Sequence, residues 1–126
     1  MAWEKQQLDE IAKAGDFRIA PFRKDGETLG TPTYIWFVTV GGSLYVRPYN
    51  GRKSRWYKAA MEQKAGAIKV DGTTLDVAFA PADAALNDKI DAAYRAKYPD
   101  SRYLPPMISE RTRAATVEVL PRDTER

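Results

Sequence analysis

Two glycine-containing turns constrain the fold of this chain more than any other feature. Asp71-Gly72 lies between the apolar residues of 68–70 and an alternating segment at 75–79, and Gly41-Gly42 lies between segments 34–40 and 43–49. Asp-Gly and Gly-Gly pairs between such segments are typical of tight β-hairpin turns. Because a hairpin pairs neighbouring strands antiparallel, the sequence favours an α+β fold with a mostly antiparallel sheet.

The remaining elements follow from hydrophobic periodicity. Residues 16–22 and 116–120 alternate as strands do, and residues 34–40 are almost continuously apolar, which predicts a central strand covered on both sides. Three helices are expected: within residues 1–15, over 54–64 capped by Ser54, and from Asp83 to about residue 98. We expect an irregular stretch from Pro105-Pro106 and a frayed polar tail over 122–126. The sequence thus predicts one domain over residues 1–126, with about six strands in a small barrel or strongly curled sheet.

The composition removes most self-sufficient catalytic mechanisms. The chain contains no His and no Cys. It therefore has no imidazole base, no thiolate nucleophile, and no His- or Cys-ligated zinc, which excludes a Ser-His-Asp triad. Any chemistry would have to come from Tyr, Lys, Arg, Asp, Glu, backbone dipoles or a bound cofactor.

Positive charge is concentrated in one segment. Residues 28–61 contain no Asp or Glu but five basic residues, so this segment carries +5 while the rest of the chain sums to −2. The whole-chain charge of +3 hides this asymmetry. Four of the five basic residues, Arg52, Lys53, Arg55 and Lys58, surround the predicted helix start at Ser54.

This arrangement predicts an anion-binding site. A helix N-terminus offers free N–H groups and partial positive charge, and basic side chains there oppose the helix dipole unless an anion is present. The alternative is that these side chains simply solvate a loop. The segment Asn50–Ser54 lacks the glycine and lysine spacing of a P-loop, and no dinucleotide-binding glycine motif is present.

The order of motifs resembles two groups of proteins. Leu44–Arg47, a glycine-containing basic loop, Trp56-Tyr57 at a helix start, and the strand leading into Val70–Gly72 resemble the split β-barrel proteins that bind flavins and deazaflavins, particularly the short deazaflavin-dependent nitroreductases. A group of uncharacterised bacterial proteins of about this length, a domain-of-unknown-function family related to that superfamily, is similar over nearly the whole chain. The shared residues there are Pro32–Val38, Leu44–Arg47, Trp56–Ala60 and the helical pattern of Asn87–Tyr98.

The resemblance implies a six-stranded split barrel that pairs as a homodimer and binds FMN or a deazaflavin coenzyme. It implies that the cofactor phosphate or tail lies among the basic loop residues, with Trp56 and Tyr57 beside the ring. By position in the motif, the implied cofactor-binding residues are Arg47, Arg52, Lys53, Ser54, Arg55, Trp56, Tyr57 and Lys58. The implied activity is oxidation or reduction of a small organic substrate, for which the cofactor would carry the hydride.

Tyrosines are the candidate proton donors in such a protein, namely Tyr57, Tyr49 and Tyr103. The aromatic and proline-rich segment 98–107 is expected either to cover a pocket or to close the barrel end. Asp83, Asn87, Asp88 and Asp91 have near-helical spacing, which we interpret as a cap and a solvated face, so no metal is expected.

Two alternatives to an oxidoreductase remain open. One is a cofactor-free binding or structural dimer of the same fold. The other is a single-stranded nucleic-acid binder, since the basic segment includes Tyr49, Trp56 and Tyr57, although a net charge of +3 disfavours it. No apolar run reaches the roughly 18–20 residues of a membrane span. Because the N-terminus also lacks a signal-peptide pattern, we expect a cytoplasmic protein without membrane contact.

Overall fold

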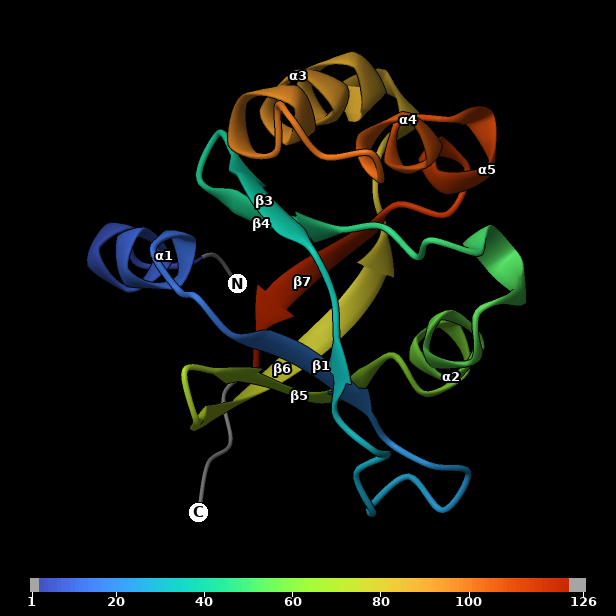
Figure 1. The fold of residues 1–126 in the computed structure, drawn as a ribbon. Coiled ribbons are helices and arrows are strands. Elements are labelled where there is room, and N and C mark those ends of the chain that lie inside the picture. The colour runs from blue at the N-terminus through green and yellow to red at the C-terminus, as the bar shows by residue number, and fades with distance from the viewer. Residues whose placement is uncertain (1–2, 123–126) are drawn as a thin grey trace.

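A seven-stranded antiparallel sheet forms the centre of the computed structural model, which describes residues 3–122 (Figure 1). The strand order is β2-β1-β5-β6-β7-β4-β3. The strands are β1 (Phe17–Pro21), β2 (Thr33–Tyr34), β3 (Phe37–Val40), β4 (Ser43–Val46), β5 (Ala65–Val70), β6 (Thr73–Pro81) and β7 (Val117–Pro121). The predicted α+β class with a curled, mostly antiparallel sheet is confirmed, with one more strand than expected.

The extra strand comes from the segment predicted as one central strand. Thr33–Tyr34 pairs with β1, whereas Phe37–Val40 pairs with β4, so one continuous segment supplies both edges of the sheet. The rings of Phe17 on β1 and Phe37 on β3 stack with 4.3 Å between centroids. The sheet therefore curls until its two edges approach each other. The prediction of a central position was wrong, because periodicity reports burial and β3 is covered on both faces while lying at an edge.

Both hairpin predictions are confirmed. β3 pairs with β4 across Gly41-Gly42, and β5 pairs with β6 across Asp71-Gly72. The φ angles are 57° and 84° in the first turn and 49° and 89° in the second. Two consecutive positive φ values match the right-handed twist of the flanking strands, which explains the choice of Gly and Asp at these positions.

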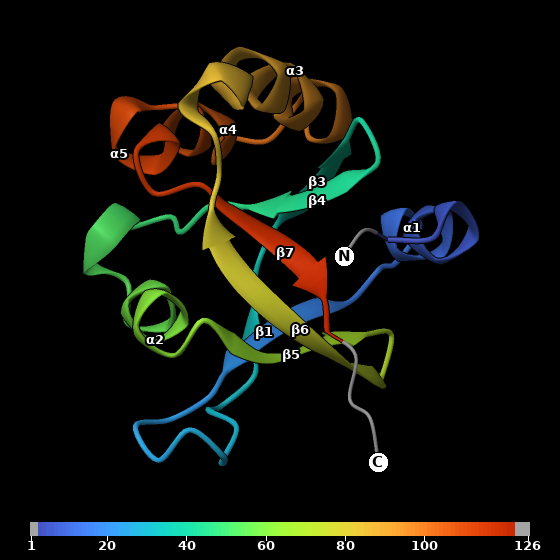
Figure 2. The same cartoon turned by 180° about the vertical axis from the view of Figure 1, so that it is seen from behind.

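Five α-helical segments lie outside the sheet. They are α1 (Lys5–Ala12), α2 (Arg55–Gln63), α3 (Asn87–Lys97), α4 (Leu104–Met107) and α5 (Glu110–Arg113), accompanied by 3₁₀ turns η1 (Gly51–Lys53) and η2 (Ala84–Leu86). The three predicted helices correspond to α1, α2 and α3. Figures 1 and 2 show α1 and α2 on opposite sides of the curled sheet, with α3, α4 and α5 together above β3 and β4. None of these helices is long and apolar enough to cross a membrane.

The prediction of an irregular stretch after Pro105 was wrong. Pro105 and Pro106 lie in the first turn of α4, where a missing N–H leaves no helical hydrogen bond unmade. Ser109 and Thr112 then donate hydroxyl hydrogen bonds to the Pro106 carbonyl, which ties α5 to α4. The predicted polar tail begins at Arg122, and residues 123–126 lie outside the described residues.

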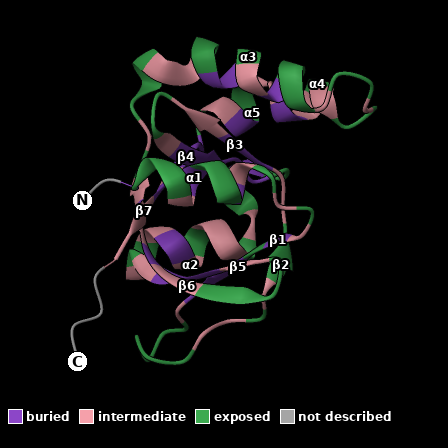
Figure 3. Cartoon of the chain, turned by 90° about the vertical axis from the view of Figure 1, so that its left-hand side faces the viewer, coloured by how far each residue is buried: buried purple, intermediate pink, exposed green. Residues whose placement is uncertain are grey.

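Two hydrophobic clusters hold the elements together, and the buried residues in Figure 3 run through the middle of the molecule. The larger cluster fills the curled sheet and includes Leu8 and Ile11 of α1 and Ala60 of α2. The smaller one joins Val38 and Tyr45, on the outer face of the β3–β4 hairpin, to Ile90, Tyr94 and Met107. The second cluster fixes α3 and α4 against the sheet and thereby fixes the loops between them.

Candidate functional site

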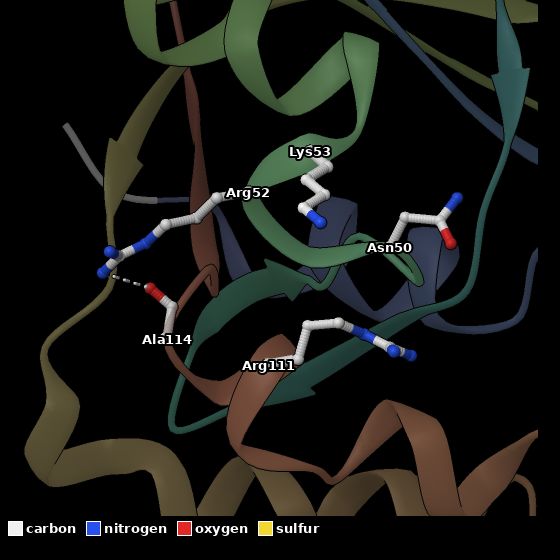
Figure 4. A pocket seen from close by; sticks show the side chains of 5 residues that line it. All are labelled: Asn50, Arg52, Lys53, Arg111 and Ala114. Atoms are coloured by element: carbon white, nitrogen blue, oxygen red, sulfur yellow. Dashed lines mark hydrogen bonds between the residues drawn. The ribbon is translucent and has the colours of Figure 1, made fainter.

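An open pocket of about 590 Å³ lies where the chain leaves the β3–β4 hairpin and meets α5. We call it the basic pocket, and its lining residues are Asn50, Arg52, Lys53, Arg111 and Ala114. In Figure 4, Lys53 from η1 and Arg111 from α5 extend from facing sides of the pocket. Arg52 donates a hydrogen bond of 3.4 Å to the Ala114 carbonyl, which spans the two segments.

Gly51 brings these two segments together. Its φ is +64°, and a Cβ at this position would lie 2.5 Å from Arg111 Cγ and 3.1 Å from the Arg111 carbonyl oxygen. Only glycine combines this backbone conformation with such a close approach. The basic pocket therefore depends on contact between η1 and α5, which are far apart in the sequence.

The basic pocket has no internal neutralising charge. No carboxylate of residues 3–122 lines it. Among the ion pairs formed within residues 3–122, none involves Arg52, Lys53 or Arg111. Three exposed cations that share one open pocket repel one another and attract an anion. Phosphate or carboxylate groups are the ligands that such a donor set binds most strongly.

The other predicted residues of the basic segment lie outside this pocket. Ser54 occupies the N-cap position of α2, but its side chain makes no capping hydrogen bond. Arg55 and Lys58 are exposed on α2. Trp56 and Tyr57 are half-buried, pack against the main hydrophobic cluster and meet edge to face at 6.5 Å between centroids. Neither ring lines the basic pocket.

Arg47 has a different environment from the one expected of a phosphate-binding residue. It is 1% exposed and forms an ion pair with the buried Asp91. Its guanidinium also donates to Thr116 Oγ1 at 2.9 Å, to the Met107 carbonyl at 3.0 Å and to Asn87 Oδ1 at 3.3 Å. These acceptors come from α3, α4 and the start of β7, so Arg47 joins the helical layer to the sheet.

This network corrects the interpretation of Asp91. Asp91 was predicted on a solvated helix face, but it is 4% exposed and also contacts Arg113 at 3.3 Å. Asp83 does cap, accepting from the Ala85 N–H at 2.9 Å, and Asp88 is exposed and pairs with Arg113. Within residues 3–122, no three carboxylates gather in a way that could hold a metal ion.

A second pocket of about 380 Å³ adjoins the basic pocket. We call it the aromatic groove, and its lining residues are Tyr34, Ile35, Trp36, Arg47, Tyr49, Tyr103 and Met107. The rings of Tyr49 and Tyr103 meet edge to face at 6.2 Å, so segment 98–107 does line a pocket as well as cover the sheet. Two of the candidate proton donors, Tyr49 and Tyr103, therefore lie together, and Tyr57 lies elsewhere.

The floor of the aromatic groove is rigidly supported. Trp36 stacks on Tyr98 with 3.9 Å between centroids and an interplanar angle of 6°. Burial raises the pKa of Tyr98 to about 12, so its hydroxyl stays protonated and donates to the Phe37 carbonyl at 3.4 Å. Because these rings are already fixed, little further side-chain freedom is lost when a ligand binds against them.

The lining residues that were not predicted as site residues include three with polar side chains, Asn50, Arg111 and Tyr34. Asn50 was missed because the predicted site began at the first basic residue of the loop, Arg52, two positions further along the chain. Arg111 lies in the stretch predicted as irregular. The nearby pair of basic residues Arg111 and Arg113 was the only sequence feature there that could have indicated a basic site. Tyr34 was assigned to a covered strand, but both residues of β2 are exposed at the edge of the sheet.

Comparison with known proteins supports the fold through one solved structure. No curated protein matches the chain. Among solved structures, the chain is similar to the conserved hypothetical protein Rv2991 from Mycobacterium tuberculosis, with a TM-score of 0.61 at 14% identity. That similarity covers 98% of this chain and 83% of the other and concerns the fold alone.

The sequence also matches a family model described as uncharacterized protein conserved in bacteria, DUF2255, over residues 7–119. This match confirms the resemblance to a bacterial family of unknown function that the motifs indicated. Since the match spans nearly all of the sheet and the helical layer, the chain belongs to the DUF2255 family of bacterial proteins.

Proposed function

We propose that this protein binds a phosphate-bearing flavin or deazaflavin, with the phosphate in the basic pocket, and uses it to oxidise or reduce a small organic molecule. One observation carries the proposal: Arg52, Lys53 and Arg111 share one open pocket that no carboxylate lines. The donor set fits the anionic end of such a cofactor, since Asn50 adds a neutral amide to three cations. The resemblance to split-barrel flavin and deazaflavin proteins supports the choice of cofactor.

The chemistry would be divided between cofactor and protein. A bound flavin or deazaflavin would donate the hydride in its reduced form, or accept it in its oxidised form, which suits a chain without His or Cys. Arg52, Lys53 and Arg111 hold and orient the phosphate. Tyr49 and Tyr103 are the groups placed to give a proton to the substrate, because both are exposed in the aromatic groove.

The direct test is a titration of the purified protein with FMN and with a deazaflavin coenzyme, followed by cofactor fluorescence and melting temperature. A ligand that binds only the folded protein raises the melting temperature. Absence of binding by either cofactor, in protein shown to be folded, would refute the redox proposal and favour a cofactor-free dimer. Sedimentation of the same samples would test the homodimer that the resemblance implies.

A matched pair of variants locates the phosphate. Arg52→Glu/Lys53→Glu reverses two pocket charges, and Arg55→Glu/Lys58→Glu reverses two exposed charges of α2 that do not line the pocket. We expect the first variant to lose cofactor binding tenfold or more, and the second to change it less than about threefold, because Arg55 and Lys58 do not line the pocket and salt weakens the effect of exposed charges. Equal losses in both variants, with salt-sensitive binding of a labelled single strand, would instead favour the nucleic-acid alternative.

A further inference from the structure

We infer that the aromatic groove receives a planar aromatic ring, and that Arg111 joins this ring site to the basic pocket so that one ligand spans both. The inference rests on the proposed function and deepens it, since it names where the ring of the phosphate-bearing ligand lies. It replaces Trp56 and Tyr57 as the expected ring contacts, because both pack against the main hydrophobic cluster.

The distribution of exposed aromatic residues is the first support. Among residues 3–122, the large apolar side chains that remain exposed are Tyr34 at 59%, Tyr49 at 44% and Tyr103 at 47%. All three line the aromatic groove, although they come from β2, from the loop after β4 and from the connection between α3 and α4. Scattered exposed aromatics need no explanation, but a gathering of all of them in one concave site marks a binding surface.

The groove is also preorganised for a flat partner. Trp36 is held by its stacking on Tyr98, and Tyr103 is held by Arg102, whose guanidinium donates to the Tyr103 hydroxyl at 3.0 Å. Tyrosine rings present wide apolar faces at low entropic cost, and stacking on them favours any flat conjugated ring. The volume of about 380 Å³ lies within the usual range of small-molecule sites.

Charge selects the kind of ring. Arg111 lines the basic pocket, and its guanidinium also lies 5.6 Å from the centroid of the Tyr49 ring in the groove. Tyr49 of the groove is followed directly by Asn50 of the basic pocket, so the two sites are lined by neighbouring residues of one loop. No carboxylate lines either site, so an aromatic group that bears phosphate complements the pair and a cationic ring does not.

Variants of the groove test the ring site separately from the phosphate site. We compare Tyr49→Leu/Tyr103→Leu with the conservative Tyr49→Phe/Tyr103→Phe, which keeps the rings. The probes are FMN, followed by its fluorescence, and inorganic pyrophosphate, followed by melting temperature and phosphorus NMR. We expect the Leu variant to bind FMN at least tenfold more weakly and pyrophosphate within twofold of the unchanged protein. The Phe variant should restore FMN affinity to within about threefold.

The outcomes separate this inference from the proposed function. If the Leu variant binds FMN normally while Arg52→Glu/Lys53→Glu does not, the ring lies elsewhere and the phosphate site stands. If the unchanged protein binds neither FMN, nor a deazaflavin coenzyme, nor pyrophosphate, the proposed function fails, and the ring site with it. If the Leu variant loses self-association in sedimentation without losing FMN, the groove is an interface between copies, which also overturns the inference.

Discussion

The buried ion pair between Arg47 and Asp91 gives the sharpest stability prediction. Asp91→Asn keeps the shape of the side chain and removes its charge. Arg47 would keep neutral acceptors from Thr116, Met107 and Asn87, but its guanidinium would remain 1% exposed with no counter-charge paired to it. Removing one partner of a buried pair costs about 3–5 kcal/mol. Because the neutral acceptors remain, we expect a loss of about 3 kcal/mol, which is roughly a fifth to three fifths of a typical domain stability of about 5–15 kcal/mol.

The same helix supplies the control. Asp88 contacts Arg113 at 2.9 Å, and Arg113 also contacts Asp91, but the Asp88 side chain is 91% exposed. Asp88→Asn should therefore cost less than about 1 kcal/mol, as surface pairs do. The measurement is urea unfolding followed by circular dichroism and tryptophan fluorescence. The slope of the free energy of unfolding against urea concentration should be the same in each variant as in the unchanged protein, so that the midpoints report stability alone. Equal losses for Asp91→Asn and Asp88→Asn would refute the reasoning that burial sets the magnitude.

A second pair of substitutions separates desolvation from attraction. Arg47→Met/Asp91→Leu removes both charges and fills similar volume. Replacement of a whole buried pair by apolar residues is often neutral or stabilising. The double variant should therefore be more stable than Asp91→Asn. A larger loss in the double variant would show that hydrogen bonds from Arg47 to Thr116 and Met107 carry most of the stability.

Two further predictions concern Gly51 and Lys97. Gly51→Ala should lower the free energy of unfolding by about 1–2 kcal/mol from its positive φ alone, and should weaken FMN binding because the new Cβ displaces Arg111. Unchanged unfolding and binding curves would contradict the contact between η1 and α5. The ammonium of Lys97 lies 3.1 Å from the centroid of the Phe37 ring, and loss of water there lowers its pKa from 10.5 to about 8. Since the unfolded chain binds this proton more tightly, stability should rise with pH across that interval, relative to Lys97→Met. A pH-independent difference in the urea midpoints of the two proteins would argue against this.

The basic pocket combines residues from two distant segments, and this explains which of its residues could be predicted from the sequence. Arg52 and Lys53 are neighbours in the sequence, so the charge pattern alone was enough to name them together as candidate anion-binding residues. Arg111 lies far along the chain and reaches them only because Gly51 lets η1 touch α5. No local pattern reports such a contact, because it depends on how α5 is held against the sheet.

The aromatic groove shows the same limit. The resemblance to split-barrel flavin proteins implied that Trp56 and Tyr57 lie beside the cofactor ring, whereas both rings pack against the main hydrophobic cluster. Tyr34, Tyr49 and Tyr103 come from three separate segments and become neighbours only when the sheet curls. Their gathering depends on the path of residues 33–40, which connects the two sheet edges.

The sequence by itself determined the features that depend on neighbouring residues. Asp71-Gly72 and Gly41-Gly42 set two hairpins, helical spacing set α1, α2 and α3, and the absence of His and Cys removed whole classes of mechanism. Tertiary structure alone decided that Asp91 is buried against Arg47, that the segment predicted as one strand serves two edges, and that Arg111 completes the basic pocket. The reason is physical: turns and helices form from contacts a few residues apart, whereas burial and pocket formation depend on segments that only the curled sheet brings together.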